Sequence, residues 1–425
     1  MGAVRGLPSR IAGNMLLLAL LPEIFFFLLF TLFLAQIEEL GSILAAIELM
    51  LAVALIIIRR VDAGLALRKY GFLLAVPVWA VLSTLWSNVP LITLRYSLQF
   101  AFTVYLGLFF AYLIPPRRFL IIVFFSVVVF ALACIASHRM GVSQTGLVLI
   151  GLTGSKNQIG YMSDIVVIAG MSVILLDRAQ AWLRGLGLLS LALGFYILLT
   201  TNSATALLEG IGGVTIVILL WGLQRLPAAG RVWLGVGLVV VITPILLIAG
   251  DWLGPAQDFM LDKLNKDSTL TGRTELWAYA DNLIAHRPIL GYGYQAIWMG
   301  SEEVLQVFGV QDGRSFHFHH TFRQLAVDTG LIGAGMFVLT LIAVAFSALA
   351  QYVTRGSVVT NFYMVMFALM VIRAFADVII GPFSAHTILF FACCAFAFWR
   401  PHAARAETGN TVPAGPGPNL RFAYR

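Results

Sequence analysis

The residues best suited to acid–base chemistry are three histidines within four positions, in the stretch FHFHHTFRQLAVDTGLIG that starts at Phe316. They are His317, His319 and His320, and the whole chain has only seven histidines. A neutral imidazole near pH 7 can accept a proton from a hydroxyl group. Clustered imidazoles can also bind zinc, although no cysteine accompanies these, and hydrogen-bonded histidines at an interface can be inert. We favour acid–base work over the other two interpretations.

A second candidate is Arg273, which opens a segment with helical periodicity. Its apolar face consists of Leu276, Trp277, Ala280, Leu283 and Ile284. We predict a helix from Arg273 to His286, ended by Pro288. A cation in the first turn opposes the helix dipole. Arg273 therefore either snorkels or pairs with Glu275, or it binds an anion together with the free backbone N–H groups.

These polar residues belong to a chain that is otherwise apolar. Its mean hydropathy is +0.93, with 60% hydrophobic and 11% charged residues, whereas soluble chains carry about twice that charge. Apolar runs of roughly 16–21 residues recur, and each can cross a bilayer core of ~30 Å. We predict an all-α polytopic membrane protein of about twelve transmembrane helices, with one large extracytoplasmic loop containing short helices. The expected spans are residues 15–35, 40–58, 70–86, 97–114, 119–137, 158–176, 182–200, 204–223, 231–250, 330–350, 358–378 and 384–399.

The distribution of basic residues predicts the orientation. Seventeen of the 27 lysines and arginines fall on one side of the predicted spans, four in the short loops and span ends of the other, and six in the loop 251–329. By the positive-inside rule both termini are cytoplasmic, and residues 251–329 are extracytoplasmic. The charge of +7 is thus explained without nucleic acid. Residues 1–400 form one transmembrane domain, and the Pro/Gly-rich residues 401–425 a disordered cytoplasmic tail.

Two further polar stretches are expected on the same outer side as the large loop. GSKNQIGYMSD carries Lys156 and Asn157 into the sixth span, and TTNSATALLEG turns at residues 200–210. Ionisable residues inside apolar spans mark functional sites by default. Arg373 and Asp377, four residues apart, are an example, although a purely structural pair on one helix face fits them too.

These motifs resemble the O-antigen ligase and polymerase superfamily, which includes the O-antigen ligase, the O-antigen polymerase and ExoQ-type exopolysaccharide polymerases. The resemblance is carried by GRTELWAYADNLIAHRPILGYGY (Gly272 to Tyr294), by HHTFRQLAVDTGLIG (His319 to Gly333) and by SKNQIG (Ser155 to Gly160). The family pattern has Gly-Arg, Trp, His-Pro and Gly-x-Gly-Tyr in the first stretch. The second is similar to its His-Asn-Ser-Tyr opening followed by Thr-Gly-Leu-Ile-Gly.

The resemblance implies roles for two residues. His319 matches the family histidine that activates the acceptor hydroxyl, and His320 replaces the usual asparagine. Arg273 matches an arginine that holds the lipid pyrophosphate. Many members carry a further Arg or Lys in the turn where this chain has Ala204. A substitute would have to come from elsewhere, and the candidates are Lys156, Arg314 and Arg323.

The expected substrate-binding residues are therefore Arg273, Lys156, Asn157, Arg314, His317, His320 and Arg323, with His319 as catalytic base and no metal or cofactor. Carboxylates are rivals for the base, and Glu302, Glu303, Asp312 and Asp328 lie nearby in sequence.

The reaction that the resemblance implies is glycosyl transfer on the periplasmic face of the bacterial inner membrane. The donor is a glycan on undecaprenyl pyrophosphate, and the acceptor is a hydroxyl of a glycan or of lipid A-core. Polymerase is favoured over ligase, and a chain-length regulator and membrane lipids are candidate partners. The alternative is a multi-span transporter of a lipid-linked or anionic substrate. Transporters commonly show internal repeats, and none stands out in this sequence.

Overall fold

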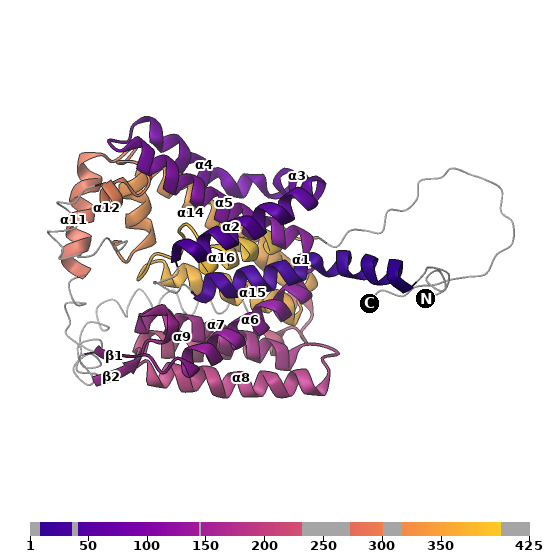
Figure 1. Cartoon of the computed structure of the whole chain (residues 1–425). Helices are drawn as coiled ribbons and strands as arrows, with labels where there is room; N and C mark the ends of the chain where they lie inside the picture. Colours follow the sequence, from indigo (N-terminus) through magenta and orange to yellow (C-terminus); the bar gives the residue numbers. More distant parts are fainter. Residues whose placement is uncertain (1–8, 36–40, 144–145, 232–272, 301–316, 401–425) are drawn as a thin grey trace, which may run out of the picture.

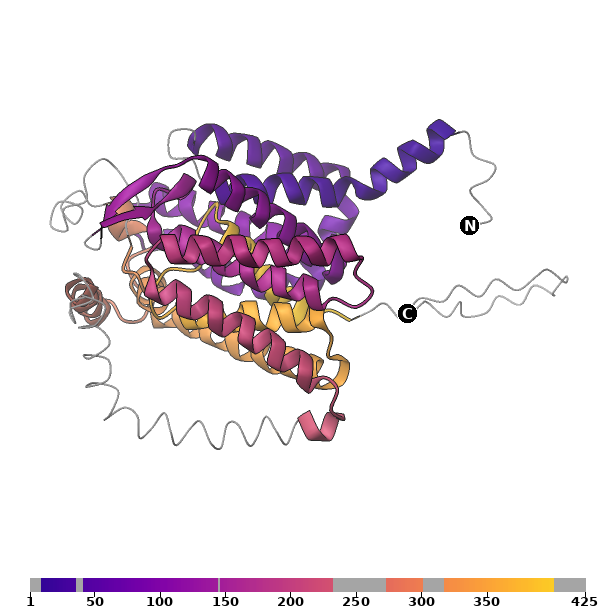
Figure 2. The same cartoon turned by 90° about the horizontal axis from the view of Figure 1, so that it is seen from below.

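Apolar helices that run side by side make up most of the molecule in the computed structural model (Figure 1, Figure 2). The structure describes residues 9–35, 41–143, 146–231, 273–300 and 317–400. Among these, seven helices are long and apolar enough to cross a membrane, and four shorter apolar helices accompany them. The prediction of a polytopic membrane protein is thus confirmed. Eleven predicted spans coincide with helices, while the span 231–250 and the tail 401–425 lie outside the described residues.

The helices before the large loop are α1 (Ser9–Ala35), α2 (Gly41–Ile58), α3 (Arg60–Tyr70), α4 (Ala75–Leu82), α5 (Pro90–Leu113), α6 (Pro116–Ala136), α7 (Lys156–Leu175), α8 (Ala181–Thr200) and α9 (Ala204–Leu223). The later ones are α11 (Arg273–His286), α12 (Ala296–Gly300), α14 (Thr321–Arg355), α15 (Val358–Arg373) and α16 (Ala385–Ala397). Short 3-10 turns occur at η2 (Gly71–Leu74), η3 (Ser83–Leu85) and η4 (Gly151–Thr153).

Helix α7 is the most enclosed of the long apolar helices that the structure describes, with 78% of its apolar window buried. Small residues let α8 approach it closely. A Cβ on Gly170 would collide with the Ser190 hydroxyl, which instead donates a hydrogen bond to the Val166 carbonyl at 3.1 Å. Small residues and hydroxyl groups are the usual means of close packing between membrane helices. The packing fixes the start of α7, where Asn157 lies.

The all-α prediction missed one element, a β-hairpin between the fifth and sixth predicted spans. Strands β1 (Met140–Ser143) and β2 (Gly146–Leu149) pair antiparallel, with Met140 opposite Leu149. The hairpin lies at the same end of the bundle as α11 and α12 (Figure 1). Pairing lets this connection satisfy its backbone N–H and carbonyl groups without a helix.

The predicted helix of the large loop is confirmed with its expected bounds, Arg273–His286. Its apolar face packs on α14 through a cluster that contains Leu276, Ala280 and Phe318. Arg323 of α14 binds Asp281 of α11 through two hydrogen bonds, of 2.8 and 3.2 Å. The loop helix is therefore docked on the end of the bundle.

Helix α14 is broken at Gly330, and the loop that follows α11 fills the break. Gly330 has φ 70° and ψ −179°, a conformation open to glycine. A Cβ there would collide with the carbonyl oxygen of Ile289. Three backbone bonds cross the gap, from Tyr292 N to Val327 O, from Gly293 N to Asp328 O and from Leu331 N to Pro288 O. These bonds join the segment that contains GYGY to the segment around TGLIG.

Helix α15 ends at Arg373, earlier than the predicted span 358–378. Thr321, the first residue of α14, forms hydrogen bonds with the backbone that follows α15. Its amide donates to Ala374 O and its hydroxyl to Asp377 O, and the hydroxyl also accepts from Ile379 N. Irregular backbone inside a membrane domain is tolerated where it is paired in this way or lines a cavity. The early end of α15 brings Asp377 close to the loop of residues 317–320, the histidine loop.

The predicted orientation can be tested by cysteine labelling at two exposed alanines. Ala278 lies on α11 and Ala181 begins α8 at the opposite end of the bundle. Ala278→Cys should react with a membrane-impermeant maleimide in intact spheroplasts, and Ala181→Cys only after lysis. The parental chain is the control, because its three cysteines are buried. The reverse labelling pattern would show that the predicted orientation is wrong.

Candidate functional site

Two adjoining cavities lie between α7, α9, α15 and α16, the start of α11 and the loop that precedes α14, at the end of the bundle that carries α11. The larger has a volume of about 190 Å³ and is lined by Ser155, Asn157, Gln158, Tyr161, His317, His319, Arg373, Asp377, Val378, Ile379 and His386. The smaller, of about 60 Å³, is lined by Asn157, Ser203, Thr205, Ala206, Glu209, Arg273, Arg373, Ala376 and Asp377. Asn157, Arg373 and Asp377 belong to both walls. The three polar stretches expected to converge therefore do so.

Asp377 faces two of the three histidines. Its Oδ1 lies 3.6 Å from His319 Nδ1 and 3.8 Å from His317 Nε2. The His319 amide donates to His317 Nδ1 at 3.1 Å, and the two rings meet edge to face. His319 has φ 50°, a conformation that a non-glycine residue adopts at a cost. The short loop is thus held so that both imidazoles turn toward one carboxylate.

The charges of this group follow from burial and proximity. Burial, and then the neighbouring His319, lower the pKa of His317 from 6.5 to about 4. Burial alone would raise the pKa of Asp377, but its interactions with His319, His317 and Arg373 outweigh burial and hold it below its usual value. At neutral pH the site therefore contains an anionic carboxylate and an uncharged His317.

The hydrogen bonds indicate which ring nitrogens carry protons. His317 Nδ1 accepts the His319 amide, so its proton belongs on Nε2, which faces Asp377. The Nδ1 of His319 faces the same carboxylate, which favours the proton on Nδ1. Nε2 is then the proton-accepting nitrogen of His319. If the 3.6 Å separation closed to a hydrogen bond, Asp377 would orient His319 as a carboxylate orients a histidine base.

The same three residues could in principle hold a metal ion, since ligand atoms of His317, His319 and Asp377 lie within 4.8 Å of one another. A bound metal requires a lone pair on the nitrogen that coordinates it, and the second ring nitrogen normally donates its proton elsewhere. In His317 the second nitrogen accepts a hydrogen bond instead. The donor set is suitable, but the tautomer does not fit coordination through Nε2.

Two arginines reach the smaller cavity. Arg273, half-buried at the start of α11, donates to the Ala376 carbonyl at 2.9 Å. This bond, rather than the alternative pairing with Glu275, holds its side chain. Arg373 is more enclosed: it contacts Glu209 at 3.0 Å and Asp164 at 3.9 Å, and its guanidinium lies 3.9 Å from the Tyr161 ring centre.

The expected pair of Arg373 with Asp377 is present at 3.8 Å, as part of a larger network. Arg373 also donates to the Asn157 carbonyl at 3.3 Å. It enters the cavity next to Ser203 and Thr205, in the turn where the sequence lacks a cation. Arg373 is thus a cation of the site. It was not among the residues predicted to replace the missing cation, which were Lys156, Arg314 and Arg323.

Several predicted residues lie beside the cavities rather than in their walls. His320 caps α14 by accepting the Arg323 amide, and Arg323 stacks on Trp277 and binds Asp281. Lys156 precedes Asn157 but is not in either wall.

The rival carboxylates do not reach the cavities in the described part of the chain. Asp328, fully buried, accepts a hydrogen bond from Gln324 at 3.0 Å and is in neither wall. Arg314, Glu302, Glu303 and Asp312 lie outside the described residues.

Tyr161 and His386 both line the larger cavity but were not among the predicted site residues. His386 was recognisable, because it is an ionisable residue within an apolar run. Tyr161 was not, since an aromatic residue in a span needs no functional explanation.

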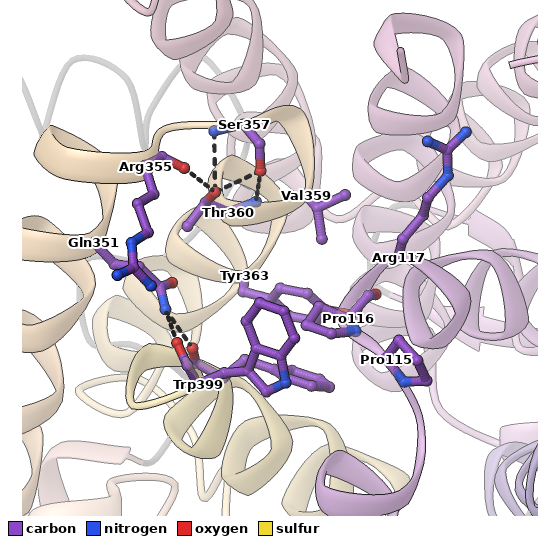
Figure 3. Close-up of a pocket in the computed structure, with 11 residues that line it drawn as sticks. Pro115, Pro116, Arg117, Gln351, Arg355, Ser357, Val359, Thr360, Tyr363 and Trp399 are labelled. Carbon is purple, nitrogen blue, oxygen red and sulfur yellow. Dashed lines mark hydrogen bonds between the residues drawn. The ribbon is translucent and has the colours of Figure 1, made fainter. Parts of the chain in front are cut away.

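A separate apolar pocket of about 360 Å³ lies at the other ends of α14 and α15. Figure 3 shows Arg117 and Arg355 on opposite sides of it, with Tyr363 and Trp399 between them. The 16 residues of α15 separate this pocket from the histidines by roughly 24 Å along the helix axis. None of the predicted site residues lines it, so the polar cavities remain the candidate site.

Comparison with known proteins supports the same region. Residues 189–338 match the family described as O-antigen ligase. The chain is also similar to the exopolysaccharide production protein ExoQ of Rhizobium meliloti (strain 1021), with 29% identity over 362 residues. That similarity covers 82% of this chain and 81% of the relative. Arg273 and His319 fall within the family match, whereas Asn157 and Asp377 fall outside it.

The histidine tautomers predict that the purified protein carries no stoichiometric metal. Elemental analysis after purification without chelator should find well below one zinc or other transition metal per chain. Native Cys134, Cys393 and Cys394 are buried and should contribute nothing. One tightly held metal per chain that disappears in both His317→Ala and Asp377→Asn would show that the cluster is a metal site.

Proposed function

We propose that the chain is a membrane glycosyltransferase of surface polysaccharide biosynthesis. The match of residues 189–338 to the O-antigen ligase family and the similarity to ExoQ over most of the chain support this proposal. The protein transfers a glycan from undecaprenyl pyrophosphate to a sugar hydroxyl on the periplasmic face. The observation that carries this proposal is the His319–Asp377 pair, set in a polar cavity beside Arg273. That arrangement supplies a base for the acceptor and a cation for the leaving group.

In the proposed reaction the acceptor oxygen attacks the anomeric carbon of the donor. His319 Nε2 takes the hydroxyl proton, and Asp377 stabilises the imidazolium that forms. The bond between the anomeric carbon and the phosphate oxygen breaks, and its electron pair leaves with undecaprenyl pyrophosphate. Attack opposite the leaving group inverts the anomeric centre. No redox step or external energy source is needed.

Arg273 is proposed to stabilise the pyrophosphate as its negative charge grows. Its described partner is the neutral Ala376 carbonyl, so an anion can compete for the guanidinium. The first-turn N–H groups of α11 lie beside it and favour an anion in the same place. Fixed donors directed at a developing charge are commonly the largest contribution to catalysis.

We favour a polymerase over a ligase, because similarity to an exopolysaccharide production protein extends over most of the chain. A polymerase adds repeat units to a lipid-linked glycan, whereas a ligase transfers the glycan to lipid A-core. The donor chemistry is the same in both. The acceptor alone distinguishes them.

The function is tested with the purified protein in nanodiscs and a lipid-linked oligosaccharide donor, with EDTA present throughout. Wild type should form products longer than one repeat from the donor alone, as a polymerase does. A ligase would require lipid A-core and add the glycan once. If wild type forms no product with either the lipid-linked glycan or lipid A-core as the acceptor, the proposed function is contradicted.

In the same assay His319→Ala should lose at least ~100-fold in kcat, since general-base catalysis contributes ~10²–10⁴-fold. Asp377→Asn should lose a comparable factor with little change in KM, because an amide that donates to Nδ1 would favour the proton on Nε2. The control is His286→Ala, an exposed histidine at the end of α11. Normal turnover in His319→Ala would refute the base assignment.

Arg273→Lys should lose roughly tenfold in kcat/KM for the donor, because lysine keeps the charge but loses the bidentate guanidinium. Arg287→Lys is the matched control, an exposed arginine that follows the same helix. Equal kinetics of the two variants would remove Arg273 from the donor site.

A further inference from the structure

The larger cavity contains two buried polar atoms that the described protein leaves unsatisfied. Tyr161 Oη and His386 Nε2 have no hydrogen-bond partner among the described residues, and both residues line the cavity. Buried polar groups are nearly always hydrogen-bonded, so two exceptions in one cavity call for a ligand. The cavity reaction described above uses neither atom.

The rings of Tyr161 and His386 are already packed against neighbouring side chains, whereas Tyr161 Oη and His386 Nε2 have no described hydrogen-bond partner. The Arg373 guanidinium lies 3.9 Å from the centre of the Tyr161 ring, and the His386 ring centre lies 4.3 Å from it. The tyrosine ring is therefore already in contact with two neighbours and is fixed in place. Its hydroxyl and the imidazole nitrogen are the groups that remain to bind something in the cavity.

The cavity has the size and polarity for one sugar ring. A cavity of about 150 Å³ accommodates a benzene ring, and this one has about 190 Å³. Ser155, Asn157 and Gln158 add a hydroxyl and two amides to its wall. Such groups donate to and accept from hydroxyls, whereas an apolar ligand would leave them unpaired.

The charges in the wall favour a neutral sugar. Arg373 is the one cation among the described lining residues, and it already contacts the carboxylates of Glu209, Asp164 and Asp377. A uronic acid would bring a further carboxylate close to Asp377 without a cation to match it.

We propose that Tyr161 and His386 form the subsite for the acceptor sugar, a single neutral hexose-type ring, and determine specificity for it. This rests on the proposed function. The ring lies in the larger cavity, beside His319, and the pyrophosphate in the smaller one, beside Arg273. Tyr161 and His386 bind the acceptor rather than take part in proton transfer.

The test separates acceptor binding from donor binding by supplying a soluble methyl glycoside as the acceptor and following its incorporation at a fixed concentration of the lipid-linked donor. Tyr161→Phe removes only the hydroxyl, and His386→Phe keeps a ring against Tyr161 while removing the nitrogen. Each variant should raise the acceptor KM about fivefold, the effect of losing one neutral hydrogen bond, and the double variant more than tenfold. The donor KM and the melting temperature should stay unchanged.

Tyr70→Phe is the matched control, because Tyr70 is also fully buried with a hydroxyl that has no described partner. It lies at the end of α3, outside both cavities, and its acceptor KM should equal that of wild type. Unchanged acceptor KM in the double variant would overturn the proposal. A rise in donor KM instead would assign the cavity to the donor sugar and also overturn it.

A binding experiment keeps the two proposals distinguishable. Saturation-transfer NMR with the nanodisc protein uses methyl glucoside, methyl galactoside and methyl glucuronide as probes. The neutral glycosides should bind wild type and lose their signal in the double variant, and the glucuronide should not bind. If the neutral glycosides bind in this way but wild type has no transferase activity, the proposed function is refuted and the sugar subsite is retained. Preferential binding of the glucuronide, or equal binding to wild type and double variant, would refute the subsite.

Discussion

The anionic carboxylate of Asp377 is the feature on which the arrangement of this site depends. A charge that is largely shielded from water must be paired or hydrogen-bonded. The Asp377 side chain is 24% exposed, lies 3.6–3.8 Å from His317, His319 and Arg373, and accepts a hydrogen bond from the Val378 amide at 2.8 Å. These partners come from two segments far apart in the chain. The histidine loop and the end of α15 must therefore be brought together before the carboxylate can be paired. The functional geometry and the stability of this end of the bundle consequently share one cause.

The backbone makes that meeting possible in two places. Helix α15 stops at Arg373 because Thr321 provides hydrogen bonds for the segment that follows. Helix α14 breaks at Gly330, where the loop after α11 inserts with its own backbone bonds. Breaks of this kind would leave polar groups unpaired if the two segments did not supply partners for each other. Each irregularity is stable only in the presence of the other segment, which couples the large loop to the membrane helices.

Patterns along the chain predicted the parts of the structure that depend on local sequence. The apolar runs matched the described helices, and the spacing of Leu276 and Ala280 gave the bounds of α11. The polar stretches that carry His319, Arg273 and Asn157 were predicted on one side of the membrane, and these residues line the two adjoining cavities. Its errors concern long-range contacts. Local sequence indicated that Arg373 and Asp377 could pair on one helix, but not that Glu209, 164 residues away, would share that arginine. The hydrophobic signal extended span eleven to residue 378, because hydropathy does not register the bonds from Thr321 that end the helix.

The partners of the two arginines assign them different work. Arg373 contacts three carboxylates, Glu209, Asp164 and Asp377, so withdrawing it toward a ligand would leave buried negative charge behind. Arg273 is held by a carbonyl oxygen, which an anionic oxygen can replace at smaller cost because hydrogen bonds to ionised acceptors are the stronger ones. Arg373 therefore keeps Asp377 in position, and Arg273 is the arginine suited to an incoming pyrophosphate. Arg373 thus lies in the cavity next to the turn that lacks a cation at Ala204, but it does not take over the function expected of that cation. In the proposed reaction, Arg273 and the N–H groups at the start of α11 would therefore stabilise the leaving group.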